Sequence, residues 1–226
     1  SIYIEGVRYT IPSATTYTYQ IPNTEGTHFI YFDVDTNGQY GISLKHLLSF
    51  SDALILQFTY VAYCYWSVSQ QKAILGLQNE RHGATMDSET HKYNHTTKGT
   101  AYVSGLGVSV NVDGDGTNNN QIQFNATGGV IADEDLRKSI SSFSMGNNIP
   151  IIYKEGANGY WVENDTATTM VLTGINGRAV FNQYTGSTWQ LTEIDNNGYG
   201  LLHLLVCTTI DSTKDWFILP GQNQYI

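Results

Sequence analysis

Residues 80–95, with the sequence ERHGATMDSETHKYNH, hold three of the six histidines in a chain of 226 residues. If the second half of this stretch is helical, Asp87, His91 and His95 recur every fourth residue and project from one face. Imidazole nitrogens and carboxylate oxygens on one helix face can ligate zinc, and His82 would complete a set of four. The spacing therefore admits a metal site.

A structural role explains the same residues without a metal. The stretch lacks the HExxH form of metalloproteases, because Lys92 follows His91 and no glutamate stands where the general base would be. Glu89 lies on a different face of the helix, and Arg81 can pair with Glu89 or Asp87. We therefore expect a polar, hydrogen-bonded helix that binds no cofactor or metal, and we keep the four-residue metal set as the alternative.

A second acidic stretch, NVDGDGTNNN at residues 111–120, resembles the first half of a calcium-binding loop. The matching residues are Asn111, Asp113, Asp115 and Gly116. Ile122 stands at the twelfth position, where a calcium loop places a bidentate glutamate. The stretch is better interpreted as a polar connection between two strands.

Other catalytic signatures are missing from the sequence. The chain contains no GxSxG elbow, no phosphate-binding glycine loop and no CxxC pair. Carboxylates at Asp33 and Asp35, or at residues 133–135, could pair for glycoside hydrolysis, but sequence spacing does not fix the separation that this reaction needs. An enzyme is therefore not the expected function.

The overall charge excludes one large class of partners. Eleven Lys and Arg residues against twenty Asp and Glu residues give a net charge of −9, and no basic cluster occurs along the chain. A protein that binds the phosphate backbone of nucleic acids needs the opposite balance. No apolar run reaches the roughly 18 residues that cross a bilayer, so we expect no membrane insertion.

The elements that must position any site are predicted to be strands. The chain is rich in Tyr and Gly, with 16 and 22 residues, and it alternates apolar and polar residues in short runs. These runs cover residues 17–21, 28–34, 58–66, 101–110, 121–126, 149–155, 160–164, 178–184, 188–194, 201–209 and 215–220. Asn-Gly pairs between the runs suit tight turns. The fold class is therefore mainly β, with antiparallel β-sandwich or jelly-roll-like modules.

Two stretches are predicted to be helical, at residues 85–96 and 133–140. The first has Thr85 or Asp87 as a plausible cap, and in the second, DEDLRKSI, acidic residues precede basic ones as the helix dipole favours. We expect the first helix to bridge two β modules. The predicted domains are an N-terminal β module at residues 1–78, a helical connector at 79–99 and a C-terminal β-sandwich at 100–226.

Exposed aromatic residues and polar loops are the candidates for ligand binding. Trp161, Trp189 and Trp216 could stack on sugars, although burial in a sandwich core is the favoured interpretation of each. The longest polar connections are residues 111–120, 141–148 and 192–200. The last of these combines Tyr199 with Asn196 and Asn197, which is the pairing of an aromatic face with amide groups that polysaccharides favour. We therefore predict that a host surface glycan, if one is bound, contacts these three residues.

One spaced motif consists of ERHG at residues 80–83 followed by Met86, Asp87, Thr90, His91, His95 and Gly99. Together with GGVIADEDL at residues 128–136, this motif resembles a family of structural proteins of tailed-bacteriophage virions, the tail-fibre or appendage proteins. Residues 17–33 and 149–162 are similar to the same family, so the resemblance covers most of the chain. Members of the family run on past the equivalent of GQNQYI, so we expect a C-terminal part of the family's architecture to be absent here.

The resemblance implies virion assembly or host attachment, and it implies no catalytic residue. We expect a non-enzymatic component of a phage tail fibre or other appendage, assembled as a homo-oligomer, most readily a trimer, beside other virion proteins. A carbohydrate-binding module and a glycan-cleaving enzyme stay open as alternatives. The first would bind glycans as an isolated monomer, and the second needs two carboxylates that converge in a cleft.

Overall fold

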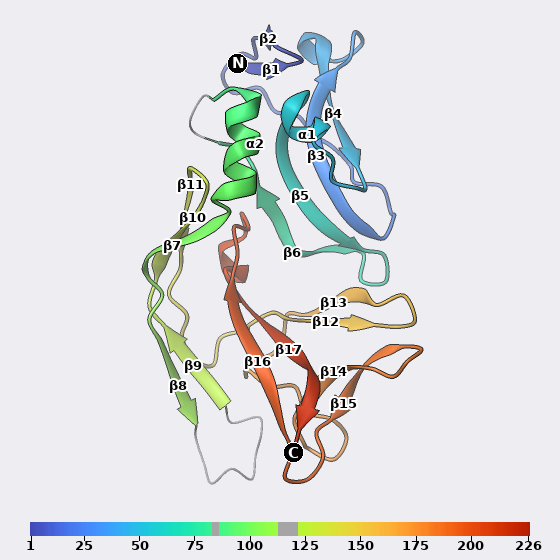
Figure 1. Cartoon of the computed structure of the whole chain (residues 1–226), viewed down its shortest axis with the longest axis vertical. Helices are drawn as coiled ribbons and strands as arrows, with labels where there is room; N and C mark the ends of the chain where they lie inside the picture. Colours follow the sequence, from blue (N-terminus) through green and yellow to red (C-terminus); the bar gives the residue numbers. More distant parts are fainter. Residues whose placement is uncertain (83–85, 113–121) are drawn as a thin grey trace. The chain divides into compact units, whose positions relative to one another are not determined.

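The computed structural model describes residues 1–82, 86–112 and 122–226, and these residues form a mainly β protein (Figure 1). The predicted class of antiparallel, sandwich-like β modules is confirmed. Over the described ranges only two segments form α-helices, and neither has the length and apolar character that crossing a membrane requires.

Two compact units alternate along the chain. Unit 1 comprises Ser1–Ala73, Leu77–Tyr102 and Ile131–Lys138. Unit 2 comprises Ile74–Gly76, Val103–Val130 and Ser139–Ile226. The sequential division of the chain after residues 78 and 99 stays a prediction.

Unit 1 is built around a four-stranded sheet in the order β4-β3-β5-β6. Its strands are β3 (Gly26–Val34), β4 (Ile42–Leu47), β5 (Thr59–Ser67) and β6 (Lys72–Asn79). Strand β3 pairs antiparallel with both β4 and β5. A small hairpin of β1 (Ile2–Ile4) and β2 (Val7–Tyr9) contacts β3 and β5, and its tight turn places Glu5 and Gly6 at positive φ.

The core of unit 1 forms where α1 (Ala53–Leu56) packs against β5. Leu54 of this helix is fully buried together with Tyr31 and Tyr60, which come from neighbouring strands of the sheet. Partly buried apolar side chains surround the three: Phe29, Leu47, Phe58 and Tyr63. The short helix therefore covers one aromatic-rich cluster of the sheet and excludes water from it.

Helix α2 (Ser88–Thr97) confirms the helix predicted at residues 85–96. Asp87 is its N-cap, and the carboxylate accepts hydrogen bonds from the backbone N–H and the hydroxyl of Thr90, at 2.9 and 2.8 Å. Helices α1 and α2 contact each other, and Lys92 Nζ lies 2.5 Å from Asp52 Oδ2 at the start of α1. The cap and the ion pair together fix where α2 begins and how it lies within unit 1.

The second predicted helix, at residues 133–140, is wrong. These residues form the turn and the second strand of a hairpin of β10 (Gly129–Asp133) and β11 (Leu136–Ile140), which joins β7 (Thr100–Gly105) in a three-stranded sheet. Glu134 in the turn has φ of +55°, a left-handed conformation that interrupts any helix. The acidic residues that suggested a helix start therefore make a two-residue turn instead.

The predicted strand at residues 17–21 is also wrong, although its alternating pattern has a structural meaning. The segment carries no strand pairing, yet odd-numbered residues are partly buried and even-numbered ones are exposed. The Tyr17 hydroxyl donates to the carbonyl of Gln39, and the Tyr19 hydroxyl contacts His46 Nδ1. Side-chain hydrogen bonds, rather than a backbone ladder, hold this extended segment.

Unit 2 contains a four-stranded sheet in the order β13-β12-β17-β16 and two further hairpins. The sheet strands are β12 (Ile151–Glu155), β13 (Tyr160–Asn164), β16 (Tyr199–Val206) and β17 (Trp216–Tyr225). The hairpins are β8 (Val108–Val112) with β9 (Ile122–Ala126), and β14 (Val180–Tyr184) with β15 (Trp189–Glu193). Because β14 contacts β17 and β15 contacts β12, the second hairpin packs on the sheet and encloses an apolar core.

Replacing Leu54 by alanine tests the core of unit 1. Because the side chain is fully buried among Tyr31 and Tyr60, we expect Leu54→Ala to lower the free energy of unfolding by about 2–5 kcal/mol. Leu48 is half exposed, so Leu48→Ala should change this free energy by less than about 0.5 kcal/mol. Urea denaturation of both variants measures the difference, and equal losses would contradict the packing described.

The cap of α2 generates a second prediction, which depends on pH. The Thr90 hydrogen bonds lower the pKa of Asp87, so the charged cap stabilises the helix above about pH 3.9, the usual aspartate value. This contribution is lost as pH falls through the lowered pKa. Asp87→Ala should therefore destabilise the protein at neutral pH, whereas Asp87→Asn keeps a neutral acceptor and loses less.

Chemical denaturation at neutral and acidic pH separates these outcomes. The stability difference between the wild type and Asp87→Asn should shrink on acidification. A difference that stays constant across the pH range would mean that the carboxylate charge plays no part in the cap.

Candidate functional site

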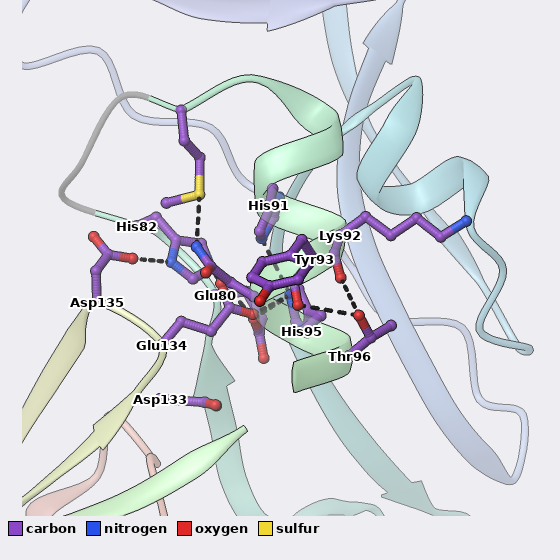
Figure 2. A network of polar contacts seen from close by, with 12 residues as sticks. Glu80, His82, His91, Lys92, Tyr93, His95, Thr96, Asp133, Glu134 and Asp135 are labelled. Carbon is purple, nitrogen blue, oxygen red and sulfur yellow. Dashed lines mark hydrogen bonds and ion pairs between the residues drawn. The ribbon is translucent and has the colours of Figure 1, made fainter. Parts of the chain in front are cut away.

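Two groups of side chains, one in each unit, gather the residues that the sequence singled out. In unit 1, Figure 2 shows His91 and His95 on α2 facing His82, with Glu134 pointing into the same space from the β10–β11 turn. One potential ligand atom from each of these four residues can be chosen so that all four atoms lie within 4.8 Å of one another. We call this group the histidine cluster.

Three separate segments position the histidine cluster. His91 and His95 are one helical turn apart on α2, as their spacing predicts. His82 follows β6, where the backbone N–H of Glu80 donates to the carbonyl of Val61 at 2.9 Å and holds the chain beside β5. The tight turn between β10 and β11 brings in Glu134. The Glu134 turn thus meets histidines that lie 39 to 52 residues earlier in the chain.

The nitrogen and oxygen atoms of the cluster approach one another to between 3.1 and 3.9 Å. His95 Nε2 lies 3.1 Å from His91 Nε2 and 3.1 Å from Glu134 Oε1. His82 Nε2 lies 3.9 Å from Glu134 Oε2. The His82 Nδ1 atom, on the other side of the ring, hydrogen-bonds to Asp135 Oδ1. The imidazole of His82 is therefore oriented by Asp135 and presents Nε2 to the centre of the cluster.

Burial governs the charge state of these groups. The Glu134 side chain is 1% exposed and that of Glu80 is 5% exposed. Burial raises the pKa of Glu134, and burial with the nearby charges of Asp133 and Glu134 raises the pKa of Glu80 to about 8. Burial and the two neighbouring imidazoles lower the pKa of His91 to about 4, and burial also lowers the pKa of His95. Both of these helix histidines are therefore neutral at physiological pH.

Several buried atoms of the cluster lack hydrogen-bond partners. These are His82 Nε2, both carboxylate oxygens of Glu134 and one oxygen of Glu80. Within the described part of the chain, the ion-pair partners of Glu80 and Glu134 are histidines, and neither carboxylate pairs with a lysine or arginine. Four such atoms in one place are unusual, because buried polar groups nearly always find a partner.

The cluster differs from the set considered from sequence in one residue. His82, His91 and His95 come together as that set required, but Asp87 caps α2 and Glu134 stands as the fourth group instead. Arg81, predicted to pair with Asp87 or Glu89, donates to Asn79 Oδ1 at 3.0 Å. No spacing in the sequence links Glu134 to the histidines, because the link is made by tertiary structure alone.

In unit 2, a surface pocket of about 440 Å³ lies beside the turn between β15 and β16. The three residues predicted to contact a glycan all line it: Asn196, Asn197 and Tyr199. Tyr199 is 63% exposed, and Asp195 and Arg178 add charged groups to the wall. We call this site the turn pocket.

The turn that forms this pocket is held rigidly. The backbone N–H of Gly198 donates to the carbonyl of Asp195 at 3.0 Å, and Asn197 takes φ of +65°, which Asn tolerates better than most residues. The Gln224 side chain forms two hydrogen bonds with Asp195. It accepts from the backbone N–H at 2.8 Å and donates to the carboxylate at 2.7 Å. Asn196 and Asn197 are therefore presented to solvent on a fixed frame.

Carboxylates near the turn pocket are engaged in hydrogen bonds. Asp195 is the one carboxylate among the described lining residues. Glu193 accepts from the backbone and side chain of Asn176 and from Arg178 Nη2, at 2.7, 2.6 and 3.2 Å. These donors, led by the Asn176 side chain, lower the pKa of Glu193, which suits a structural anchor rather than a general acid.

The other residues that the sequence suggested for ligand binding are the three tryptophans, the 141–148 connection and the calcium-like stretch. Trp216 is buried and donates from Nε1 to the carbonyl of Ser141 at 2.8 Å, so it is not a stacking platform. Trp161 and Trp189 are partly buried on either side of Lys154, whose ammonium lies 5.1 and 4.9 Å from the two rings. Six residues of the 141–148 connection line a second pocket with Trp216: Ser141, Ser142, Phe143, Gly146, Asn147 and Asn148. Asp113, Asp115 and Gly116 of the calcium-like stretch lie outside the described residues.

Comparisons of the chain with protein-family models, curated proteins and solved structures find no match. The function proposed for this chain therefore depends on its own residues and their geometry.

Proposed function

We propose that this chain is a non-enzymatic structural component of a tailed-phage virion, part of a tail fibre or other appendage, and that unit 2 binds a host surface glycan through the turn pocket. The observation that carries the binding role is the gathering of Asn196, Asn197 and Tyr199 around one surface pocket. The motif at residues 80–99 and its continuation at 128–136, which resemble phage appendage proteins, support the setting.

The chemistry of the turn pocket suits a neutral or hydroxyl-rich sugar. A half-exposed tyrosine ring offers an apolar face to the C–H groups of a pyranose, and asparagine amides both donate to and accept from hydroxyls. Because Gln224 and the turn hydrogen bonds already order Asp195 and its neighbours, little conformational entropy is lost when a ligand binds. A rigid loop on a β frame is a common place for recognition.

The two alternatives are distinguished by the carboxylates and by assembly. Glycoside hydrolysis requires two carboxyl groups about 5 to 9.5 Å apart across the scissile bond. The described lining of the turn pocket offers Asp195 alone, and Glu193 is engaged by Asn176 and Arg178, which favours binding over cleavage. A free carbohydrate-binding module would use the same pocket, so only its state of assembly separates it from a virion component.

Removing the three pocket side chains tests the binding role. We expect the combined variant Tyr199→Ala, Asn196→Ala and Asn197→Gly to lose at least about tenfold in affinity, because two or three contacts of about 1 kcal/mol each disappear. Glycine is chosen at residue 197 because it keeps the positive φ without strain. Binding of the purified chain to an array of bacterial surface polysaccharides, and adsorption to host cells, measure the loss.

A matched control lies in the turn at residues 157–160, which repeats the Asn-Gly-Tyr order of the pocket turn. Asn158 and Tyr160 are exposed there and do not line the turn pocket. The double variant Asn158→Ala and Tyr160→Ala should bind like the wild type. Unchanged glycan binding by the pocket variant, or equal losses in both variants, would refute the assignment.

Assembly is a separate prediction of the virion role. Identical β chains that pair around an axis cover exposed strand edges and multiply weak glycan contacts, so we expect a homo-oligomer, most readily a trimer. Analytical ultracentrifugation at micromolar concentration measures the state of the purified protein. A monomer with undiminished glycan affinity would instead favour the carbohydrate-binding module.

A further inference from the structure

We propose that unit 1 binds one divalent transition-metal ion, with His82, His91, His95 and Glu134 as its ligands, and that this ion is structural. The histidine cluster and the turn pocket belong to different units and share no residue, so each can be tested without the other. It replaces the metal-free interpretation that the sequence favoured, because Glu134 and its burial could be seen only in the fold.

The first support is the spacing of the donor atoms. Ligands of a tetrahedral zinc ion at about 2.0 Å lie roughly 3.3 Å from one another. His95 Nε2 lies 3.1 Å from both His91 Nε2 and Glu134 Oε1, and His82 Nε2 lies 3.9 Å from Glu134 Oε2. Small rotations of these side chains would bring all four donors to one ion. Two imidazole nitrogens facing each other at 3.1 Å are well placed to share a cation.

The second support is the set of buried atoms without partners. Both oxygens of Glu134 and Nε2 of His82 are buried, the side chains are 1% and 9% exposed, and none of the three atoms has a hydrogen bond. Leaving such groups unpaired in the interior is costly. One metal ion at the centre of the cluster would bond to His82 Nε2 and to one oxygen of Glu134, since both side chains point there (Figure 2).

The surrounding groups resemble the outer shell of known metal sites. A ligating histidine usually donates its other ring N–H to a carboxylate, which fixes the ring and strengthens the ligand. Asp135 contacts His82 Nδ1 in this way and leaves Nε2 toward the cluster. Glu80 lies 3.8 Å from His95 Nε2 and 3.9 Å from His82 Nε2 and adds a second buried carboxylate beside the four ligands.

The balance of charge also favours a cation. Two buried carboxyl groups, Glu80 and Glu134, each lie within 3.9 Å of the ring nitrogens of His82 and His95. A neutral imidazole presents the lone pair that a metal requires. In the described residues neither carboxyl group forms an ion pair with a lysine or arginine, so a divalent ion at the cluster would stabilise the charged form of both.

The donor set selects the class of metal and its role. Three imidazoles and one carboxylate suit zinc, iron(II) or a related transition ion, whereas calcium and magnesium prefer oxygen ligands. Four protein ligands complete a tetrahedral shell and leave no open position for a substrate, as in structural zinc sites. The ion would join α2, the segment after β6 and the β10–β11 turn, and so stabilise unit 1.

Zinc binding by the full chain, free of any histidine tag, tests this proposal. The protein is dialysed against a chelator, returned to buffer and titrated with Zn²⁺ by calorimetry, while metal content is measured by mass spectrometry. We expect one tightly bound Zn²⁺ per chain and a higher midpoint of thermal unfolding for the zinc-loaded protein. A protein that binds no Zn²⁺ under these conditions would overturn the proposal.

Variants locate the ion. Glu134→Gln preserves shape and removes the charged ligand, so Zn²⁺ affinity should fall at least tenfold, and the double variant His91→Ala and His95→Ala should bind no Zn²⁺ in the cluster. His203 is exposed on β16 and serves as the matched control, since His203→Ala should bind like the wild type. Equal affinity in Glu134→Gln and His203→Ala would show surface binding only and would refute the site.

Co²⁺ binding to the wild-type protein tests the site without any variant, and so does not depend on whether a variant folds. Co²⁺ substituted into the wild-type protein reports its coordination through visible absorption, and four nitrogen and oxygen ligands give the intense bands of a tetrahedral ion. Bands of that kind, displaced by one equivalent of Zn²⁺, support the site. The weak spectrum of hydrated, six-coordinate Co²⁺ would contradict it.

Discussion

The burial of Glu134 without a hydrogen-bond partner is the constraint on which the account of unit 1 depends. A carboxylate in this position needs either a proton or a cation, and in the described residues its ion-pair partners are His82 and His95. The turn that carries Glu134 and the helix that carries His91 and His95 therefore meet at a point where a metal ion would stabilise both.

The sequence predicts the fold well where local signals and tertiary packing agree. The strands at β3, β5, β13 and β15 coincide with alternating runs, and Asp87 caps α2 as an N-cap residue should. Prediction fails where one local pattern fits two structures. The acidic start of residues 133–140 suits a helix and a turn alike, and alternation at residues 17–21 arises from tyrosine hydrogen bonds without strand pairing.

How far each candidate site could be predicted from the sequence depends on how many chain segments contribute residues to it. Asn196, Asn197 and Tyr199 belong to one turn, so their proximity follows from the sequence and needs only an adjacent pocket. The histidine cluster draws its decisive carboxylate from a distant hairpin, and helical spacing supplies only His91 and His95. Local spacing reveals a site held by one segment, but a site that joins several segments emerges only with the fold.

An anomalous difference map at the zinc absorption edge tests most directly whether the histidine cluster holds a metal ion. Crystals of the chain grown with one equivalent of Zn²⁺ should show a single strong peak about 2.0–2.2 Å from His82, His91, His95 and Glu134. A map with no peak among these four side chains, or with peaks only at exposed residues such as His203, would contradict the account.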